Sequence, residues 1–202
     1  MKKKSDPLRR VLERITEYNE IAQIGEIARR YFAMNAFDGV LTIIGVLMGH
    51  YAAGVEDALI VVTTGLTTSI AIGISGLWGS FLTESAERKR EIDELSESTL
   101  TDQNGSKIGK ASRFAAIAVA LIDGLSPFFA SLIVLIPFFF AAFFKDIHYV
   151  YFTSIGFALL VLFGLGIFLG KISKQSLVVM GLKTLAAGIV SILISNLLGI
   201  SH

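Results

Sequence analysis

The stretch YFAMNAFDGVLTIIGVLMGHYAAGVEDALIVVTTGLTTSIAIGISGLWGSFLT, residues 31–83, holds only three charged side chains, which are Asp38, Glu56 and Asp57. A transmembrane helix needs roughly 20 predominantly apolar residues. The two apolar runs on either side of Glu56 and Asp57 therefore predict two spans, over 31–55 and 58–83, joined by a short polar turn. The chain is thus expected to begin its apolar part with a helical hairpin in a membrane.

The rest of the chain has the same character. Of its 202 residues, 53% are hydrophobic and 17% are charged, and the mean hydropathy is +0.66. This composition is too apolar for an ordinary soluble domain and excludes a large soluble catalytic one. Further apolar runs predict spans over 114–144, 149–170 and 182–200. We therefore expect an all-α polytopic protein whose five transmembrane helices form one domain, residues 31–202.

Two polar segments lie outside these spans. Residues 1–30 begin with the helix-start pattern Ser5-Asp6-Pro7 and predict an N-terminal amphipathic helix. This helix can lie on an anionic inner leaflet, or it can be a linker helix that packs on a neighbouring subunit. Residues 84–113 are rich in charge, contain a turn-forming Asn-Gly pair and predict a solvated cytosolic loop.

The orientation follows from the positive charges. Cytoplasmic segments of membrane proteins retain Lys and Arg. With the N-terminus inside, 17 of the 18 Lys and Arg residues fall on the inner side, and only Lys145 falls outside. We therefore predict an N-inside, C-outside protein of the cell membrane, in contact with membrane lipids.

Two carboxylates fall within the predicted spans, at Asp38 and Asp123. An ionised side chain at the bilayer centre costs about +2.5 to +3.5 kcal/mol on the insertion scale, so such residues usually face a cavity, a partner or an ion path. A carboxylate there can bind a hard cation or carry a proton. The alternative is that either aspartate caps a broken helix or accepts a hydrogen bond from a facing Ser or Thr.

Each of these aspartates is followed by a glycine, Gly39 or Gly124. A glycine lets another backbone or an ion approach closely. The shared Asp-Gly pair also suggests that spans 1–2 and 3–4 are repeated units. Pro127 and Pro137 in the third span predict a kinked or broken helix there.

Oxygen ligands outside these two aspartates form two further sets. Thr64, Thr68 and Ser75 share a face of the second span and can line a path beside Asp38, although such hydroxyls often bond their own i−4 carbonyls. Four glutamates then recur at helical spacing and can gather cations at the cytosolic mouth. The alternative is a salt-bridged solvated face, since Arg and Lys are interspersed. The glutamates are Glu84, Glu87, Glu91 and Glu94.

The segments NAFDGVLTIIGVLMG (35–49) and GLTTSIAIGISGLWGSFLTESAERKRE (65–91) resemble the first hairpin of the vacuolar iron transporter family, and GLKTLAAGIVSILISNLLGI (181–200) is similar to its last span. The resemblance implies a homodimer that moves ferrous iron or another divalent metal out of the cytosol in exchange for protons. It also implies that Asp38 lies on the metal path. Thr68 and Gly76 stand where the family has a glutamate and a methionine, and its cytosolic metal-binding helices need more sequence than 84–113 provides.

The sequence therefore favours a secondary transporter of a divalent cation, iron or manganese, that works as a proton antiporter without a cofactor. The alternative is a membrane scaffold or regulator that has kept the fold and lost the ligands. An enzyme is not expected, because the chain has no Cys and no P-loop, G-x-S-x-G or H-E-x-x-H motif. No nucleic-acid motif accompanies the basic N-terminus, so a nucleic-acid partner is not expected either.

Overall fold

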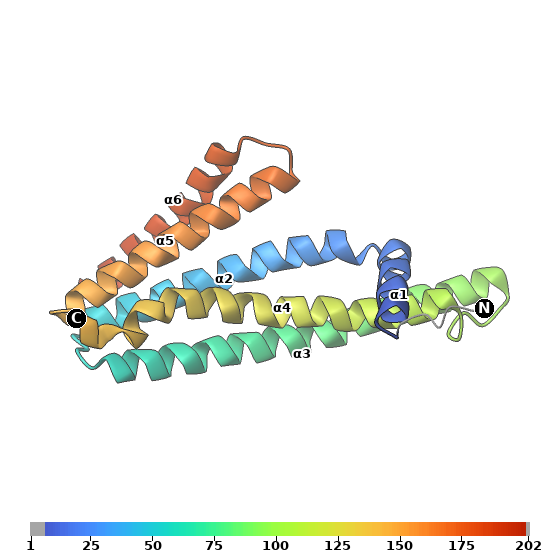
Figure 1. The fold of residues 1–202 in the computed structure, drawn as a ribbon, viewed down its shortest axis with the longest axis horizontal. Coiled ribbons are helices and arrows are strands. Elements are labelled where there is room, and N and C mark those ends of the chain that lie inside the picture. The colour runs from blue at the N-terminus through green and yellow to red at the C-terminus, as the bar shows by residue number, and fades with distance from the viewer. Residues whose placement is uncertain (1–6, 201–202) are drawn as a thin grey trace. The chain divides into compact units, whose positions relative to one another are not determined.

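The computed structural model describes the backbone of residues 7–200, and the side chains of residue 13 and residues 15–199. These residues form α-helices and one short 3₁₀ helix, with no strand between residues 7 and 200 (Figure 1). The helices are α1 (Pro7–Ala22), α2 (Ile24–Ala52), α3 (Ala58–Thr99), α4 (Lys107–Phe139), η1 (Ala141–Phe143), α5 (Ile147–Ile172) and α6 (Leu177–Ile200).

Five of the described segments are long and apolar enough to cross a membrane, which confirms the predicted all-α class and number of spans. They are Ile24–Ala52, Ala58–Thr99, Lys107–Phe143, Ile147–Ile172 and Leu177–Gly199. The chain is therefore a multi-pass integral membrane protein.

The segment 84–113 differs from the expected loop. Helix α3 continues to Thr99 and α4 begins at Lys107, so only residues 100–106 are irregular. The polar end of α3 is supported by ion pairs at helical spacing, such as Arg90 Nε to Glu94 Oε1 at 3.1 Å. The helix ends where Leu100 adopts a positive φ of 53°. Alternating charges thus extend the helix into a stretch whose composition alone indicated a loop.

The N-terminal segment also differs from a single helix over 1–30. Gln23 has a positive φ of 49° and separates α1 from α2, and the Asn19 side chain accepts a hydrogen bond of 2.8 Å from the Gly25 N–H. Residues 24–30 therefore belong to the first spanning helix. The cap expected at Ser5 and Asp6 lies outside the described residues.

The prolines of the third span do not divide it at Pro127. Helix α4 runs through Pro127, where the Ser131 hydroxyl donates a 2.6 Å hydrogen bond to the Pro127 carbonyl. It ends two residues after Pro137, and η1 follows. The missing N–H of Pro137 therefore coincides with the end of the helix rather than with a break inside it.

The chain forms two compact units. Unit 1 comprises Met1–Tyr31 and Gly76–Asp123, of which residues 1–6 are not described, and unit 2 comprises Phe32–Ser75 and Gly124–His202, of which 201–202 are not described. Helices α2, α3 and α4 each contribute residues to both units.

The largest apolar core lies in unit 2. Ile43, Ile44 and Leu47 of α2 are fully buried there together with Leu135 of α4. Tyr151 of α5 is also buried, and its hydroxyl donates a 2.9 Å hydrogen bond to the Val55 carbonyl after α2. This bond satisfies the polar end of a large aromatic side chain inside an apolar core.

Helices α5 and α6 form a hairpin in unit 2 and run side by side (Figure 1). A Cβ atom added at Gly181 would lie 2.5 Å from the Phe163 ring, so a larger residue there would require the ring to move. The Thr184 hydroxyl of α6 lies 2.8 Å from the Leu162 carbonyl of α5. Small residues and a side-chain hydrogen bond are the usual means by which helices associate in membranes.

Candidate functional site

Asp38 lies in the middle of α2, in unit 2, and its side chain is exposed on the single chain. Among the described residues the carboxylate has no hydrogen bond and no ion pair; only its backbone carbonyl is used, by the Thr42 hydroxyl at 2.9 Å. An exposed carboxylate without a partner is unusual in a spanning helix, because contact with lipid is energetically costly.

Gly39, the residue after Asp38, packs directly against the backbone of α4 in unit 2. A Cβ atom at Gly39 would lie 2.5 Å from the Pro127 carbonyl oxygen, and the Ser131 hydroxyl lies 3.2 Å from the Gly39 carbonyl. The structure therefore gives this glycine a packing role. Close contact between the backbones of α2 and α4 fixes the position of the neighbouring Asp38.

The second glycine of the Asp-Gly pairs is also at a helix contact in unit 2. A Cβ atom at Gly73 of α3 would lie 3.0 Å from the Gly124 carbonyl oxygen of α4. Both Asp-Gly pairs thus occur where two helix backbones approach closely, as the absence of a side chain permits.

Asp123 has a different environment from Asp38 and belongs to unit 1. Its side chain is 8% exposed, and its Oδ2 accepts a 2.6 Å hydrogen bond from the Ser80 hydroxyl of α3. Sequence reasoning did not identify Ser80. The available signal was its place at i−4 from Glu84, which puts both side chains on one face of α3.

The three hydroxyls expected beside Asp38 have separate surroundings. The Thr64 hydroxyl donates to the Ile60 carbonyl and lies 3.1 Å from Nε2 of His50. Thr68 is half-buried and Ser75 is exposed. No hydrogen bond joins any of the three to the Asp38 carboxylate within the described part of the chain.

Glu84 is held by neighbours in unit 1. Its carboxylate forms a 3.1 Å ion pair with Arg88, and these side chains are only 17% and 11% exposed. The Tyr31 hydroxyl of α2 donates to Glu84 Oε1 at 3.3 Å. The glutamate nearest the membrane therefore joins α2 to α3 rather than standing open to solvent.

The remaining glutamates of the stripe lie further along α3. Glu87 and Glu94 both pair with the exposed Arg90, at 3.5 and 3.1 Å. Glu91 is exposed and lines a cavity with Leu95. Over residues 7–200, no group of three or more His, Asp or Glu side chains comes together in a way that could hold a metal ion.

Comparison with known proteins identifies the family. The family model described as the VIT family matches residues 90–200, which is more than half of the chain. The chain belongs to the VIT family. A curated relative, described as an uncharacterized protein of Methanocaldococcus jannaschii, is 35% identical over 169 residues, which cover 82% of this chain and 85% of the relative.

Membership of the VIT family confirms the resemblance to the vacuolar iron transporters. The family match includes residues 181–200 and Asp123, and it begins after Asp38 and most of the first hairpin, on which the resemblance chiefly rested. VIT proteins are membrane transporters of metal ions rather than enzymes. This chain is thus a multi-pass membrane protein of a metal-transporting family.

Proposed function

We propose that this VIT protein exports a divalent metal cation, iron or manganese, from the cytosol across the cell membrane in exchange for protons. The observation that carries the proposal is the exposed Asp38 carboxylate, which has no partner among the described residues at the centre of a spanning helix. Asp38 is the metal ligand, because carboxylate oxygens suit hard divalent cations.

A second copy of the chain completes the site. An isolated carboxylate binds a divalent cation weakly, and the described residues offer no three-acid cluster around it. The cost of exposing Asp38 to lipid favours covering this face of α2 with protein. Because two-fold symmetry places the same patch on both subunits, a homodimer through α2 brings two Asp38 carboxylates together.

The other candidate residues have supporting roles in this proposal. Thr64, Thr68 and Ser75 line the path with neutral oxygens, and the buried Asp123 with its Ser80 partner carries protons. The stripe from Glu84 to Glu94 attracts cations at the cytosolic mouth, with Glu91, which has no ion pair among the described residues, as its open ligand.

Flux measurements test the path. The full chain in proteoliposomes with a metal-sensitive dye is expected to transport Fe²⁺ or Mn²⁺ and to move protons in the opposite direction. Asp38→Asn is expected to lower this flux at least about tenfold, because a neutral amide binds a divalent cation far less well. Asp93→Asn, which alters an exposed acid on α3, serves as the matched control. Unchanged flux in Asp38→Asn would overturn the proposed site.

Cysteine cross-linking tests the dimer, and the chain has no native Cys to interfere. Met34 is 58% exposed one turn before Asp38, and Leu160 on α5 is 69% exposed. Oxidation is expected to cross-link Met34→Cys in membranes as a dimer and to leave Leu160→Cys monomeric. Failure of Met34→Cys to cross-link would contradict an interface at this face of α2.

A membrane scaffold remains the second candidate, and two observations favour it. The described residues contain no three-acid cluster, and Glu84, Glu87 and Glu94 are already ion-paired. A folded wild-type protein that moves none of iron, manganese, zinc or protons in proteoliposomes would favour the scaffold over the transporter.

A further inference from the structure

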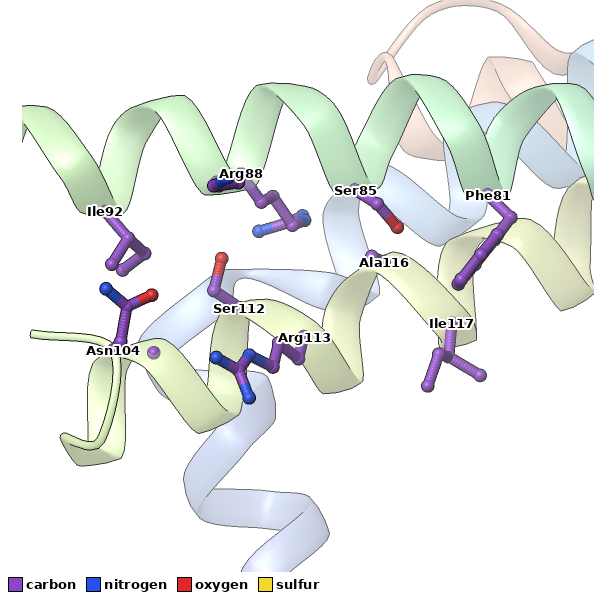
Figure 2. Close-up of a pocket in the computed structure, with 11 residues that line it drawn as sticks. Phe81, Ser85, Arg88, Ile92, Asn104, Ser112, Arg113, Ala116 and Ile117 are labelled. Carbon is purple, nitrogen blue, oxygen red and sulfur yellow. The ribbon is translucent and has the colours of Figure 1, made fainter.

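Unit 1 contains a cavity of about 380 Å³ between the last part of α3 and the first part of α4 (Figure 2). One end is apolar and includes Phe81, Ala116 and Ile117. The other end is cationic and polar. Its side chains are Arg88, Lys89, Asn104, Ser112 and Arg113, and the apolar Ile92 lies at the same end.

The two ends of the cavity fall on opposite sides of the predicted membrane boundary. Phe81 and Ile117 lie within the predicted apolar spans, whereas Lys89 and Arg113 lie in the charged segment 84–113. Arg88 lies seven positions after Phe81 on the helix, which is about 10 Å along the axis. The cavity therefore extends from an apolar environment to a cationic one, and this distance is roughly the thickness of the headgroup region of a lipid leaflet.

Ser112 supplies an unsatisfied polar group inside this space. Its side chain is 7% exposed, and its hydroxyl has no hydrogen-bond partner among the described residues. Figure 2 shows the hydroxyl pointing from α4 toward α3, on the side where the Arg88 guanidinium lies. A buried hydroxyl without a partner is unfavourable, so its presence in the wall of a cavity indicates a ligand that accepts a hydrogen bond.

The charge of the cavity wall is positive. Lys89 and Arg113 have no ion pair among the described residues, whereas Arg88 shares its charge with Glu84. A neighbouring cavity of about 420 Å³ shares Arg88 and Ser112 and also contains Glu91. The excess of positive charge in the cavity wall therefore comes from Lys89 and Arg113.

We propose that this cavity binds an anionic phospholipid of the inner leaflet. Lys89 and Arg113 hold the phosphate, and the Ser112 hydroxyl donates a hydrogen bond to one of its oxygens. An acyl chain covers Phe81 and Ile117, which are 39% and 51% exposed. The apolar end favours a lipid over a free phosphate, because a free phosphate leaves that surface uncovered.

Binding of phosphatidylglycerol to the full chain in detergent tests the proposal directly. We expect phosphatidylglycerol, and not phosphatidylcholine, to raise the melting temperature. The double variant Lys89→Gln/Arg113→Gln is expected to weaken phosphatidylglycerol binding about tenfold, since it removes charge-assisted hydrogen bonds. Lys110→Gln removes a cation from the same helix outside the cavity and should bind as the wild type does. Equal weakening in Lys110→Gln would overturn the proposal by indicating non-specific attraction.

Ser112→Ala separates lipid binding from a structural role. Without anionic lipid this variant should be at least as stable as the wild type, because it removes an unpartnered buried hydroxyl. With phosphatidylglycerol its gain in melting temperature should be smaller than that of the wild type. The proposal would be overturned if Ser112→Ala lost equal stability in phosphatidylglycerol and in phosphatidylcholine. It would also be overturned if sodium phosphate raised the melting temperature of the wild type as much as phosphatidylglycerol does. None of these measurements depends on metal flux, so they stand or fall separately from the transport function.

Discussion

The Ser80 hydroxyl donates a 2.6 Å hydrogen bond to the Asp123 carboxylate, and both side chains are buried in unit 1. The bond joins α3 to α4 and gives a buried carboxylate a polar partner. Asp38 precedes a glycine in the same way and has no such partner among the described residues. Two identical dipeptides therefore occupy different environments, which argues for a stabilised buried acid at Asp123 and an available ligand at Asp38.

Removal of the Ser80 hydroxyl should destabilise the protein more than neutralisation of its partner. Ser80→Ala leaves the buried Asp123 carboxylate without this donor and should lower the free energy of unfolding by about 1–3 kcal/mol. Asp123→Asn keeps an acceptor oxygen and removes a buried charge, so its stability should change less. Unfolding in mixed detergent micelles measures both. A larger loss in Asp123→Asn would show that the charge itself stabilises unit 1.

Gly39 should not tolerate even a methyl group. A Cβ atom there lies 2.5 Å from the Pro127 carbonyl oxygen, so Gly39→Ala should cost about 1–3 kcal/mol through overpacking between α2 and α4. Gly45 on the same helix has open space around its added Cβ atom. Gly45→Ala should therefore be neutral or stabilising by up to about 1 kcal/mol. Similar melting temperatures for the two variants would contradict the close backbone contact.

The ion pairs of α3 should differ in strength with their burial. Glu84→Gln leaves the largely buried Arg88 without its anion and should cost about 1–3 kcal/mol. Glu87→Gln breaks a pair whose side chains are 58% and 66% exposed, and it should cost less than about 1 kcal/mol. Thermal unfolding of both variants at low and high salt checks this ranking. A negligible effect of Glu84→Gln would favour Glu84 as an open cation ligand instead.

The hydrogen bonds between Asp102 and Asn104 in the loop between α3 and α4 should weaken in acid. The backbone N–H and side-chain amide of Asn104 both donate to Asp102 Oδ1 at 2.9 Å, and they hold the pKa of Asp102 below its usual range. Because the folded pKa is depressed, this contribution is present above the unfolded pKa and disappears as the pH falls through the folded value. Carboxyl ¹³C NMR should show the low pKa in the wild type and a partial return toward normal in Asn104→Ala. An unchanged Asp102 pKa in Asn104→Ala would contradict a contribution from the side-chain amide and would show that the backbone N–H alone lowers the pKa.

The length of each uninterrupted apolar run was enough to predict the spans. A helix needs about 20 apolar residues to cross the bilayer core, whatever packs against it. The runs 31–55, 58–83 and 182–200 could be predicted as spans from composition, and helices cover all of them except residues 53–55. Composition alone gave the wrong prediction for residues 84–99, where Glu–Arg pairs at helical spacing and the buried Ile92 support a helix.

Only the tertiary structure decided what surrounds each polar residue in the membrane. The sequence placed Asp38 and Asp123 in spans, but the Ser80 hydroxyl that donates to Asp123 lies 43 positions away in the chain. It likewise gave no reason to expect a Ser112 hydroxyl in a cavity wall with no partner in the described part of the chain. Hydropathy measures how strongly each residue prefers lipid to water. These contacts depend instead on which faces of separate helices meet, and the order of residues along the chain does not specify that packing.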